Sequence, residues 1–331
     1  MRKTEATVSE DYYSKIGDVI IPTSGETAED IATATCVMKP GVILAGDLCI
    51  MRTSKIDGRF LSYTINHKVK YDIARIAQGK SVVHIRPEEV EQVKVCYPGK
   101  PEQEKILHFI ELLSQKIEKQ KVLIESLKLY KRGLINNLFD RKIKTAGIWK
   151  KYGLSEILTE RKTYCEKDGT YEHATLSKEG VYGKTERYDR DFLVSSDDKK
   201  YKITKYGDLC YNPANLKFGV ICLNTYGDAI FSPIYVTFEI APDFDKHFIA
   251  ACVTRNDFIN AALQFQQGTV YERMAVSPED LLSMEIELPE ASIQKYYSNV
   301  FQKLDLLIEA YEKQLDATVV QKKTLLQQMF I

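Results

Sequence analysis

The sequence predicts an α/β protein: two domains of mixed strands and helices, joined by two long helices that pair antiparallel as a coiled coil. Apolar residues recur at alternating steps of four and three along residues 101–139 and again along residues 289–330, which is typical of a coiled-coil seam. The sequence also repeats itself. Gly207-Asp208 follows Gly17-Asp18 by 190 residues, and Phe330 follows Phe139 by 191. A period held that closely across globular and helical parts indicates a duplication.

The two long helices are the strongest local signal. The first is predicted from Pro101 to Phe139 and would be on the order of 58 Å long, so its seam needs a partner. Since one chain must return each helix end to a domain, we expect the two helices to run antiparallel. The predicted seam contains Ile106, Ile110, Leu113, Ile117, Ile124, Leu127 and Leu134 in the first helix, and Tyr297, Val300, Leu304, Leu307, Tyr311 and Leu325 in the second.

The elements of the first domain follow from short apolar runs and turn residues. Strands are predicted at residues 16–22, 41–51, 81–85 and 93–97, with a helical patch at 59–78 and a helix start at Pro87. The resulting division is residues 1–98 for the first domain, 99–140 for the first long helix, 141–148 for a linker, 149–288 for the second domain and 289–331 for the second long helix.

The repeat is incomplete at its front. Residues 149–190 of the second copy have no counterpart in the first, because shifting them back by 190 leaves the chain. The first domain is therefore expected to lack part of the sheet or packing that the second retains. We expect an edge strand or core face to be exposed there unless another chain covers it.

Composition limits the classes of function. The 331 residues, 44% of them apolar, can bury more than one core, and 46 basic residues balance 46 acidic ones. This excludes a uniformly basic nucleic-acid-binding protein but not a local basic face. The seven cysteines form no Cys-x-x-Cys pair and lie mostly in apolar runs, which favours reduced thiols and a cytoplasmic protein. We expect no signal peptide and no membrane span.

The helix ends resemble a known family. The opening Pro101-Glu102-Gln103 and the ending at residues 131–139, Lys-Arg-Gly-Leu-Ile-Asn-Asn-Leu-Phe, are similar to the conserved helices of the specificity (S) subunits of type I restriction-modification systems. Gly17-Asp18 and Gly207-Asp208 resemble the Gly-Asp strand of that family's target-recognition domains, and residues 149–157 resemble their opening. The resemblance covers almost the whole chain. The second helix departs from it by lacking Glu-Gln after Pro289.

The resemblance implies a DNA-reading scaffold. Members of this family hold two target-recognition domains apart on two antiparallel helices, and each domain reads one half of a split double-stranded DNA sequence. They have no catalytic site. They recruit two methyltransferase subunits and, in the full complex, a translocating nuclease subunit. The truncated front puts the reading of one half-site in doubt.

Candidate DNA contacts are side chains that can bond base edges or phosphates. Arg suits guanine, Asn and Gln suit adenine, and Lys suits phosphate. Arg187 and the loop from Asn212 to Lys217 are the preferred base readers. The full set is Lys184, Arg187, Tyr188, Arg190, Lys199, Lys200, Lys202, Asn212, Asn215, Lys217, Gln267, Thr269, Tyr271 and Arg273 in the second domain, with Thr23, Ser24 and Lys80 in the first.

Enzyme motifs do not match their requirements. Residues 212–215, Asn-Pro-Ala-Asn, fail the Asn-Pro-Pro-aromatic tetrad of a methyltransferase, and no Gly-x-x-x-x-Gly-Lys phosphate loop occurs. No His or Cys set has zinc spacing, so we expect no catalytic residue, no metal and no cofactor. Two alternatives stay open. One is a silent or split specificity cassette whose first domain needs a partner chain, and the other is a helical scaffold without a DNA role.

Overall fold

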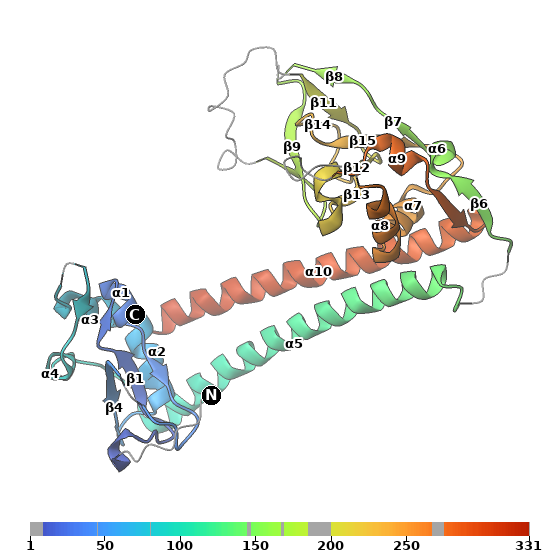
Figure 1. The fold of residues 1–331 in the computed structure, drawn as a ribbon. Coiled ribbons are helices and arrows are strands. Elements are labelled where there is room, and N and C mark those ends of the chain that lie inside the picture. Colours follow the sequence, from blue (N-terminus) through green and yellow to red (C-terminus); the bar gives the residue numbers. More distant parts are fainter. Residues whose placement is uncertain are drawn as a thin grey trace. The chain divides into compact units, whose positions relative to one another are not determined.

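The computed structural model describes residues 9–44, 46–79, 81–143, 147–166, 169–184, 200–266 and 275–330. It consists of two compact units, unit 1 with residues 1–124 and 310–331 and unit 2 with residues 125–309. Two long helices, α5 (Lys100–Phe139) and α10 (Ala291–Met329), each contribute to both units. Below, domain 1 denotes the described residues 9–99 of unit 1, and domain 2 denotes the described residues 147–290 of unit 2 (Figure 1).

Domain 1 is built on a small antiparallel sheet with the strand order β3-β1-β4. The short strands β2 and β5 form a separate two-stranded sheet, and short helices connect the strands of domain 1. The elements are η1 (Glu10–Tyr12), β1 (Val19–Pro22), β2 (Ser24–Gly25), α1 (Ala28–Ile31), β3 (Thr35–Cys36), β4 (Leu48–Met51), α2 (Gly58–His67), α3 (Lys70–Ile76), β5 (Val83–His84) and α4 (Pro87–Val90). The predicted helical patch is thus two helices.

Domain 2 contains two larger sheets, ordered β13-β12-β15-β7 and β10-β9-β14-β11-β8, and a pair of strands, β16 with β6. Its strands are β6 (Lys150–Gly153), β7 (Leu158–Glu160), β8 (Tyr164–Cys165), β9 (Glu172–Leu176), β10 (Val181–Gly183), β11 (Tyr201–Thr204), β12 (Leu209–Tyr211), β13 (Ile221–Leu223), β14 (Ala229–Phe231), β15 (Val236–Ile240) and β16 (Glu285–Leu288). Its helices are α6 (Leu154–Ile157), η4 (Pro213–Phe218), α7 (Lys246–Val253), α8 (Asn256–Ala262), η5 (Leu263–Phe265) and α9 (Pro278–Leu282).

The strand pairing follows the sequence repeat. In domain 1, β1 lies between β3 and β4, and in domain 2, β12 lies between β13 and β15. Both central strands follow a tight turn in which Gly17 (φ 90°) or Gly207 (φ 87°) is left-handed, a conformation that strongly favours glycine. The Gly-Asp pairs recognised in the sequence therefore mark the same turn in both domains.

The segment β6–α6–β7 of domain 2 has no counterpart among the described residues of domain 1. In domain 2, β7 covers the outer side of β15, and β6 pairs with β16. In domain 1, β4 is therefore an edge strand, and residues 93–97, the counterpart of β16, form no strand. The predicted strand at 93–97 was wrong because a strand needs a hydrogen-bonding partner, and the partner of β16 has no equivalent there.

Each long helix contributes to the core of both units. In unit 1, Leu107 and Ile110 from the first third of α5 pack with Leu326 and Phe330 from the end of α10. In unit 2 the roles are exchanged: Leu138 from the end of α5 and Phe301 from the first third of α10 are fully or almost fully buried in the domain core. The helices therefore run antiparallel in both units.

One polar contact is made twice with the helices exchanged. In unit 2, Lys131 of α5 donates to Asp305 of α10 at 2.5 Å. In unit 1, Lys322 of α10 donates to Ser114 of α5 at 2.8 Å. Lys322 follows Lys131, and Asp305 follows Ser114, by the same 191 residues that separate the helix ends. The repeat thus reproduces an interhelical contact as well as a sequence pattern.

Each predicted seam position of α5 is buried or half-buried. The predicted α10 seam needs one correction. Leu307 is 42% exposed, whereas Ile308 is 7% exposed. The α5 heptad also passes through Gln120, Lys131 and Leu138. Shifting its ten positions by 191 residues gives positions that are all buried or half-buried: Tyr297, Phe301, Leu304, Ile308, Tyr311, Leu315, Thr318, Lys322, Leu325 and Met329. The repeat period therefore locates the α10 seam better than the apolar pattern of α10 alone.

One glutamine at the start of each long helix joins that helix to its domain. Gln103 donates to the Pro98 carbonyl at 2.8 Å and accepts from the Asp57 N–H at 2.9 Å. Gln294 donates to the Pro289 carbonyl at 2.8 Å and accepts from the Asp245 N–H at 3.2 Å. The second helix thus keeps the glutamine of the first, although it lacks the Glu-Gln pair.

Replacing Gln103 or Gln294 by alanine is expected to destabilise the corresponding unit by about 1–3 kcal/mol, because a backbone N–H and a carbonyl lose their partner in a buried place. Urea unfolding followed by circular dichroism measures the loss. Gln115→Ala, on the exposed face of α5, is the control. Equal stability of Gln103→Ala and Gln115→Ala would contradict this role.

None of the helices in the described part of the chain combines the length and the apolar character needed to cross a membrane.

Candidate nucleic-acid interface

Most of the predicted DNA-contacting residues lie outside the part of the chain that the structure describes. They are Lys80, Arg187, Tyr188, Arg190, Lys199, Gln267, Thr269, Tyr271 and Arg273. Their role stays a prediction. The described candidates are Lys184, Lys200, Lys202, Asn212, Asn215 and Lys217 in domain 2, with Thr23 and Ser24 in domain 1.

Two of the described candidates have structural roles, which corrects their assignment. Asn212 is 6% exposed, and its side-chain oxygen accepts from the N–H groups of Ala214 and Asn215 at 3.1 and 3.3 Å. It caps η4 as a helix N-cap. Lys202 is 2% exposed, and its Nζ donates to Glu160 at 2.7 Å. An ammonium held in a buried ion pair is not available to a phosphate.

The residues of domain 1 are also engaged within the fold. Ser24 donates its hydroxyl to Asp47 at 2.7 Å. The backbone N–H of Thr23 donates to the Asp47 carbonyl at 2.8 Å, and its carbonyl accepts from Ile85 at 3.0 Å. These bonds tie residues 23–24 to Asp47, just before β4, and to Ile85, just after β5. Thr23 and Ser24 are half-buried residues engaged within the fold, so this loop is a weak candidate for DNA contact.

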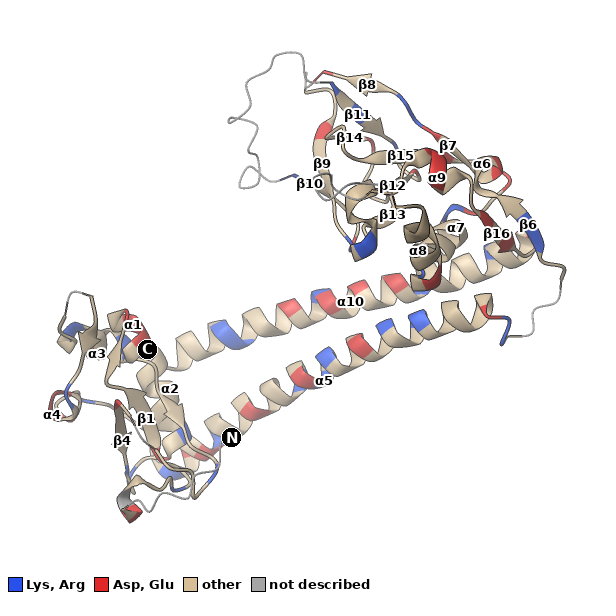
Figure 2. Ribbon diagram, in the orientation of Figure 1, with Lys and Arg blue, Asp and Glu red and all other residues tan. Residues whose placement is uncertain are grey.

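A basic surface remains at the η4 end of domain 2. Lys217 is exposed at the last turn of η4, with its Nζ 5.0 Å from the centre of the exposed Phe218 ring. The exposed Lys178, in the turn between β9 and β10, lies against Gly219, since a Cβ on that glycine would be 3.6 Å from Lys178 Cε. We call Lys178, Asn215, Lys217 and Phe218 the η4 surface. Figure 2 marks the basic residues on the ribbon.

Lys178 was not among the predicted residues. Its sequence context, Ser177-Lys178-Glu179-Gly180, predicts a polar turn and nothing more specific. In the structure this turn after β9 lies against Gly219, which directly follows η4. Cations, an amide and an exposed aromatic ring are the groups that bind phosphates, bases and unstacked nucleotides.

The Gly-Asp turn that recurs in both domains holds a buried carboxylate. Asp208 is 2% exposed, accepts from the Lys205 N–H at 2.8 Å and is bound by both arms of Arg161 at 2.7 and 2.9 Å. Asp18 is 3% exposed, accepts from the Lys15 N–H at 2.8 Å and is bound by Arg52. The Gly-Asp motif therefore builds the turn and is not a base-reading element.

The two arginines come from different places. Arg161 directly follows β7, whereas Arg52 directly follows β4. Domain 1 has no described counterpart of β7, so a guanidinium from the neighbouring strand takes the same role. Burial would raise the pKa of Asp18, but the hydrogen bonds from Arg52 and Lys15 and the guanidinium charge hold it below its ordinary value.

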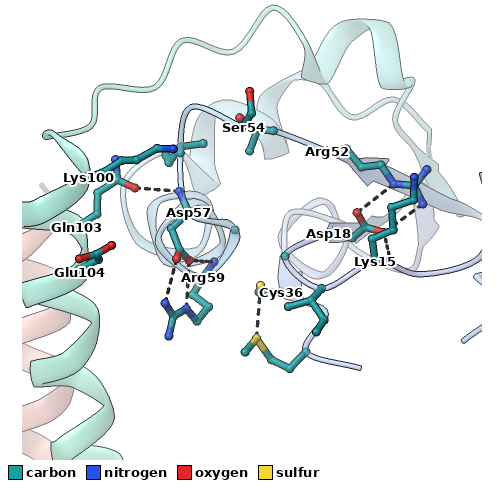
Figure 3. Close-up of a pocket in the computed structure, with 16 residues that line it drawn as sticks. Lys15, Asp18, Cys36, Arg52, Ser54, Asp57, Arg59, Lys100, Gln103 and Glu104 are labelled. Carbon is teal, nitrogen blue, oxygen red and sulfur yellow. Dashed lines mark hydrogen bonds and ion pairs between the residues drawn. The ribbon is translucent and has the colours of Figure 1, made fainter. Parts of the chain in front are cut away.

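A cleft of about 690 Å³ lies beside this turn in domain 1 (Figure 3). Arg52 and Asp18 form one wall, and the pair Asp57 and Arg59 at the start of α2 forms another. The hydrogen bond from Arg59, despite partial burial, lowers the pKa of Asp57. Both arginines are thus paired with carboxylates. Lys15, Lys100 and Glu104 also line the cleft, so its charges are of mixed sign.

No model of a known protein family matches the sequence, and no curated protein matches it. Solved structures do match. An S subunit of a type I restriction-modification system from M. genitalium superposes with a TM-score of 0.58 and 14% identity, covering 97% of this chain and 85% of that one. A structure reported for complex assembly and conformational transition of the type I restriction-modification system gives 0.57 and 14% identity, with 96% and 81% covered.

A third match is the HsdS subunit from Thermoanaerobacter tengcongensis, with a TM-score of 0.50, 14% identity, and 96% and 80% covered. All three matches extend over both domains and both long helices of this chain, since each covers at least 96% of it. The two-domain architecture with long antiparallel helices, predicted from the repeat, is therefore confirmed. The chain has the fold of the S subunits of type I restriction-modification systems.

Proposed function

We propose that the chain is the DNA-specificity subunit of a type I restriction-modification complex. In this role the chain binds one or both halves of a bipartite double-stranded DNA target, and domain 2 is the reader of one half. The chain itself is a non-catalytic reader and scaffold in the cytoplasm. The long helices dock methyltransferase subunits and, in the full complex, a nuclease subunit.

The observation that carries this proposal is the duplicated architecture. Each domain rests on the start of its own long helix and on the end of the other one, and the contact of Lys131 with Asp305 recurs as that of Lys322 with Ser114. A protein with two related readers and twofold-like helix pairing suits a DNA site split into two halves. The likeness to S-subunit structures over nearly the whole chain supports the same conclusion.

The η4 surface provides the first test. In the double variant Lys178→Ala/Lys217→Ala, two cations that would contact phosphate are removed. Each such contact contributes about 0.9 to the slope of log affinity against log salt concentration, so the slope is expected to fall by about 1.8. Fluorescence anisotropy of the full chain with a random-sequence duplex, measured over a series of salt concentrations, gives this slope.

The matched control is Lys150→Ala/Lys151→Ala, which removes two exposed lysines from β6 in the same domain. This control should keep the slope of the unaltered chain. Equal slopes for both double variants would show that the η4 surface does not contact DNA. A complete lack of salt-dependent DNA binding by the unaltered chain would contradict the proposed function itself.

A second candidate function is favoured by the open edge of β4. A specificity cassette whose first domain is completed by another polypeptide would act only as part of that assembly. In domain 2 the equivalent strand is covered by β7, which shows what a completed domain looks like.

A further inference from the structure

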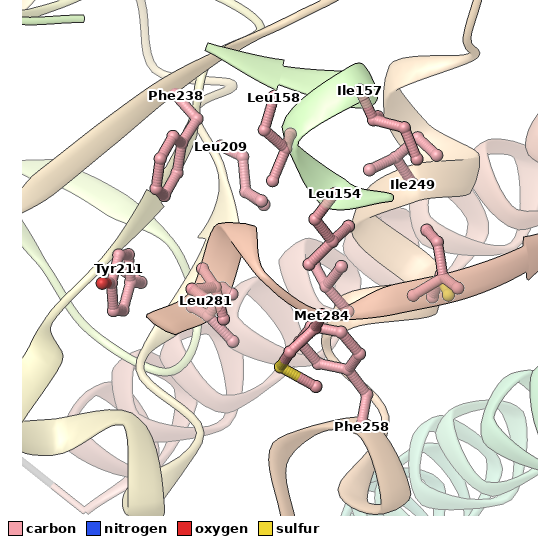
Figure 4. Close-up of a cluster of buried hydrophobic side chains, with 14 of the residues drawn as sticks. Leu154, Ile157, Leu158, Leu209, Tyr211, Phe238, Ile249, Phe258, Leu281 and Met284 are labelled. Atoms are coloured by element: carbon pink, nitrogen blue, oxygen red, sulfur yellow. The ribbon is translucent and has the colours of Figure 1, made fainter. Parts of the chain in front are cut away.

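Domain 2 shows which segment covers the edge that is open in domain 1. Residues 150–160 run as β6, α6 and β7, and they bury Leu154, Ile157 and Leu158 to 0–2% exposure. Figure 4 shows these three side chains packed among Leu209, Phe238 and Met284. The backbone is held as well, because Ala241 donates to the Ile157 carbonyl at 2.8 Å and Arg161 donates to the Thr237 carbonyl at 2.9 Å.

The residues of domain 1 that correspond to this binding site are more exposed. Met51 lies opposite Val19 in the sheet of domain 1, and Phe238 lies opposite Leu209 in the sheet of domain 2. Met51 therefore corresponds to Phe238. Met51 is half-buried, whereas Phe238 is fully buried. The same holds beside α4. The 191-residue repeat relates three residues of domain 1 to three of domain 2: Val93 to Met284, Val95 to Ile286 and Tyr97 to Leu288. The three residues of domain 2 are 8%, 7% and 0% exposed.

In domain 1, Val93 and Val95 are half-buried and Tyr97 is 42% exposed. The alternation at residues 93, 95 and 97 is that of a half-buried strand, yet these residues pair with no strand in the described part of domain 1. Domain 1 thus combines an open sheet edge with an unpaired strand-like segment that carries apolar side chains. In domain 2 one continuous piece of chain, residues 150–160, covers both equivalents.

We propose that domain 1 is an acceptor site for a strand–turn–strand segment of a second polypeptide, which adds to the edge of β4 and pairs with residues 93–97. The occupant has the chemistry of residues 150–160: a short strand, a turn with two apolar residues three positions apart, and a second short strand. Main-chain hydrogen bonds supply the affinity and the apolar side chains supply the register, as in other cases of strand addition. The inference goes beyond the proposed function and does not depend on DNA binding.

The charge next to β4 specifies the occupant further. In domain 2 the residue that follows Phe238 in β15 is Glu239, which forms an ion pair at 3.2 Å with Arg161, the residue directly after β7. The corresponding residue of domain 1 is Arg52, which binds Asp18. An arginine at the end of the incoming segment would therefore face another arginine. A segment for domain 1 should carry an acidic or neutral residue at the position equivalent to Arg161.

A labelled synthetic peptide with the sequence of residues 149–161 but with Arg161→Glu tests the site, using the full chain. Binding is expected by fluorescence anisotropy, with hydrogen-exchange protection at residues 48–51 and 93–97. The same peptide with the native arginine should bind about three- to fivefold more weakly, as for an exposed ion pair. A peptide with Leu154, Ile157 and Leu158 replaced by serine should not bind.

The acceptor side has its own matched pair of variants. Tyr97→Asp places a charge on the proposed site and should weaken peptide binding at least about fivefold. Tyr71→Asp, on the exposed side of α3, should leave it unchanged. No binding up to about 1 mM peptide, or protection only in residues 236–240 of domain 2, would overturn the proposal. So would a dimer by light scattering that excludes the peptide, because a second copy would then occupy the site.

Discussion

Replacing Asp208 by alanine is expected to lower the free energy of unfolding of unit 2 by about 3–5 kcal/mol, the usual cost of leaving one partner of a buried ion pair alone. The carboxylate is 2% exposed, and the side chain of Arg161 is 13% exposed. Removing the carboxylate leaves a guanidinium largely out of water, and it also removes the acceptor of the Lys205 N–H in the turn.

The corresponding change in domain 1, Asp18→Ala, is the internal comparison. Its partner Arg52 has a side chain that is 32% exposed, so water can solvate the guanidinium once the carboxylate is gone. The destabilisation of unit 1 should therefore be smaller, about 1–3 kcal/mol. Hydrogen exchange of β12 and β1 reports the two units separately. A larger loss for Asp18→Ala than for Asp208→Ala would show that burial does not decide the cost.

The sequence predicted the architecture because the same signal is present twice. Apolar spacing over about forty residues predicts both a long helix and its length. The 191-residue offset between Phe139 and Phe330 relates the two helices. The observed helices Lys100–Phe139 and Ala291–Met329 end within one residue of where that offset places them. Antiparallel pairing followed from the need to return each helix end to a domain.

The apolar spacing of one helix predicted its buried residues less reliably where that helix packs on two partners. The buried stripe of α10 includes Phe301 and Ile308, which face a domain core or the helix seam. Of the predicted residues, Val300 is half-buried and Leu307 is 42% exposed. A stripe that serves both a domain and a helix is wider than a heptad seam. Several registers then fit the apolar residues equally well, and only the repeat distinguishes them.

The candidate site was harder to predict than the fold, because the same residue types serve structure and recognition. Asn212 in front of Pro213 is a polar loop residue by sequence, but an Asn in that position is also a preferred helix cap. Lys202 lies in a strand, where its neighbour Glu160 comes from a distant segment. Lys178 joins the η4 surface only through the packing against Gly219. The contacts of Lys202 and Lys178 have no local signature.

The strand at residues 93–97 failed for a different reason. Alternating apolar residues report a preference for extended backbone, but a strand exists only when its N–H and carbonyl groups find a partner. In domain 2 the same sequence position is a strand because β6 pairs with it over four residues. The local signal was correct, and what was missing was a segment of chain that no local pattern can supply.

The phenylalanines that end the two helices should have separable effects on the two units. Phe330 is 3% exposed. The centre of its ring lies 5.1 Å from that of Phe60 and 5.9 Å from that of Tyr63 in domain 1. Phe330→Ala should destabilise unit 1 by about 3–5 kcal/mol, because it removes a buried ring and leaves a cavity. Hydrogen exchange of α2 should accelerate accordingly, while that of α7 should change little.

Phe139→Ala is the reciprocal variant. Phe139 contacts Phe248 at 5.2 Å and Trp149 at 5.9 Å in domain 2, and it is half-buried, so the expected loss is smaller, about 2–3 kcal/mol. It should accelerate exchange in α7 and leave α2 unchanged. Leu129→Ala, at a position of α5 that is 63% exposed, should change neither region by more than about 0.5 kcal/mol. Equal acceleration of α2 and α7 by either phenylalanine variant would contradict this assignment, because each helix end would then stabilise both domains alike.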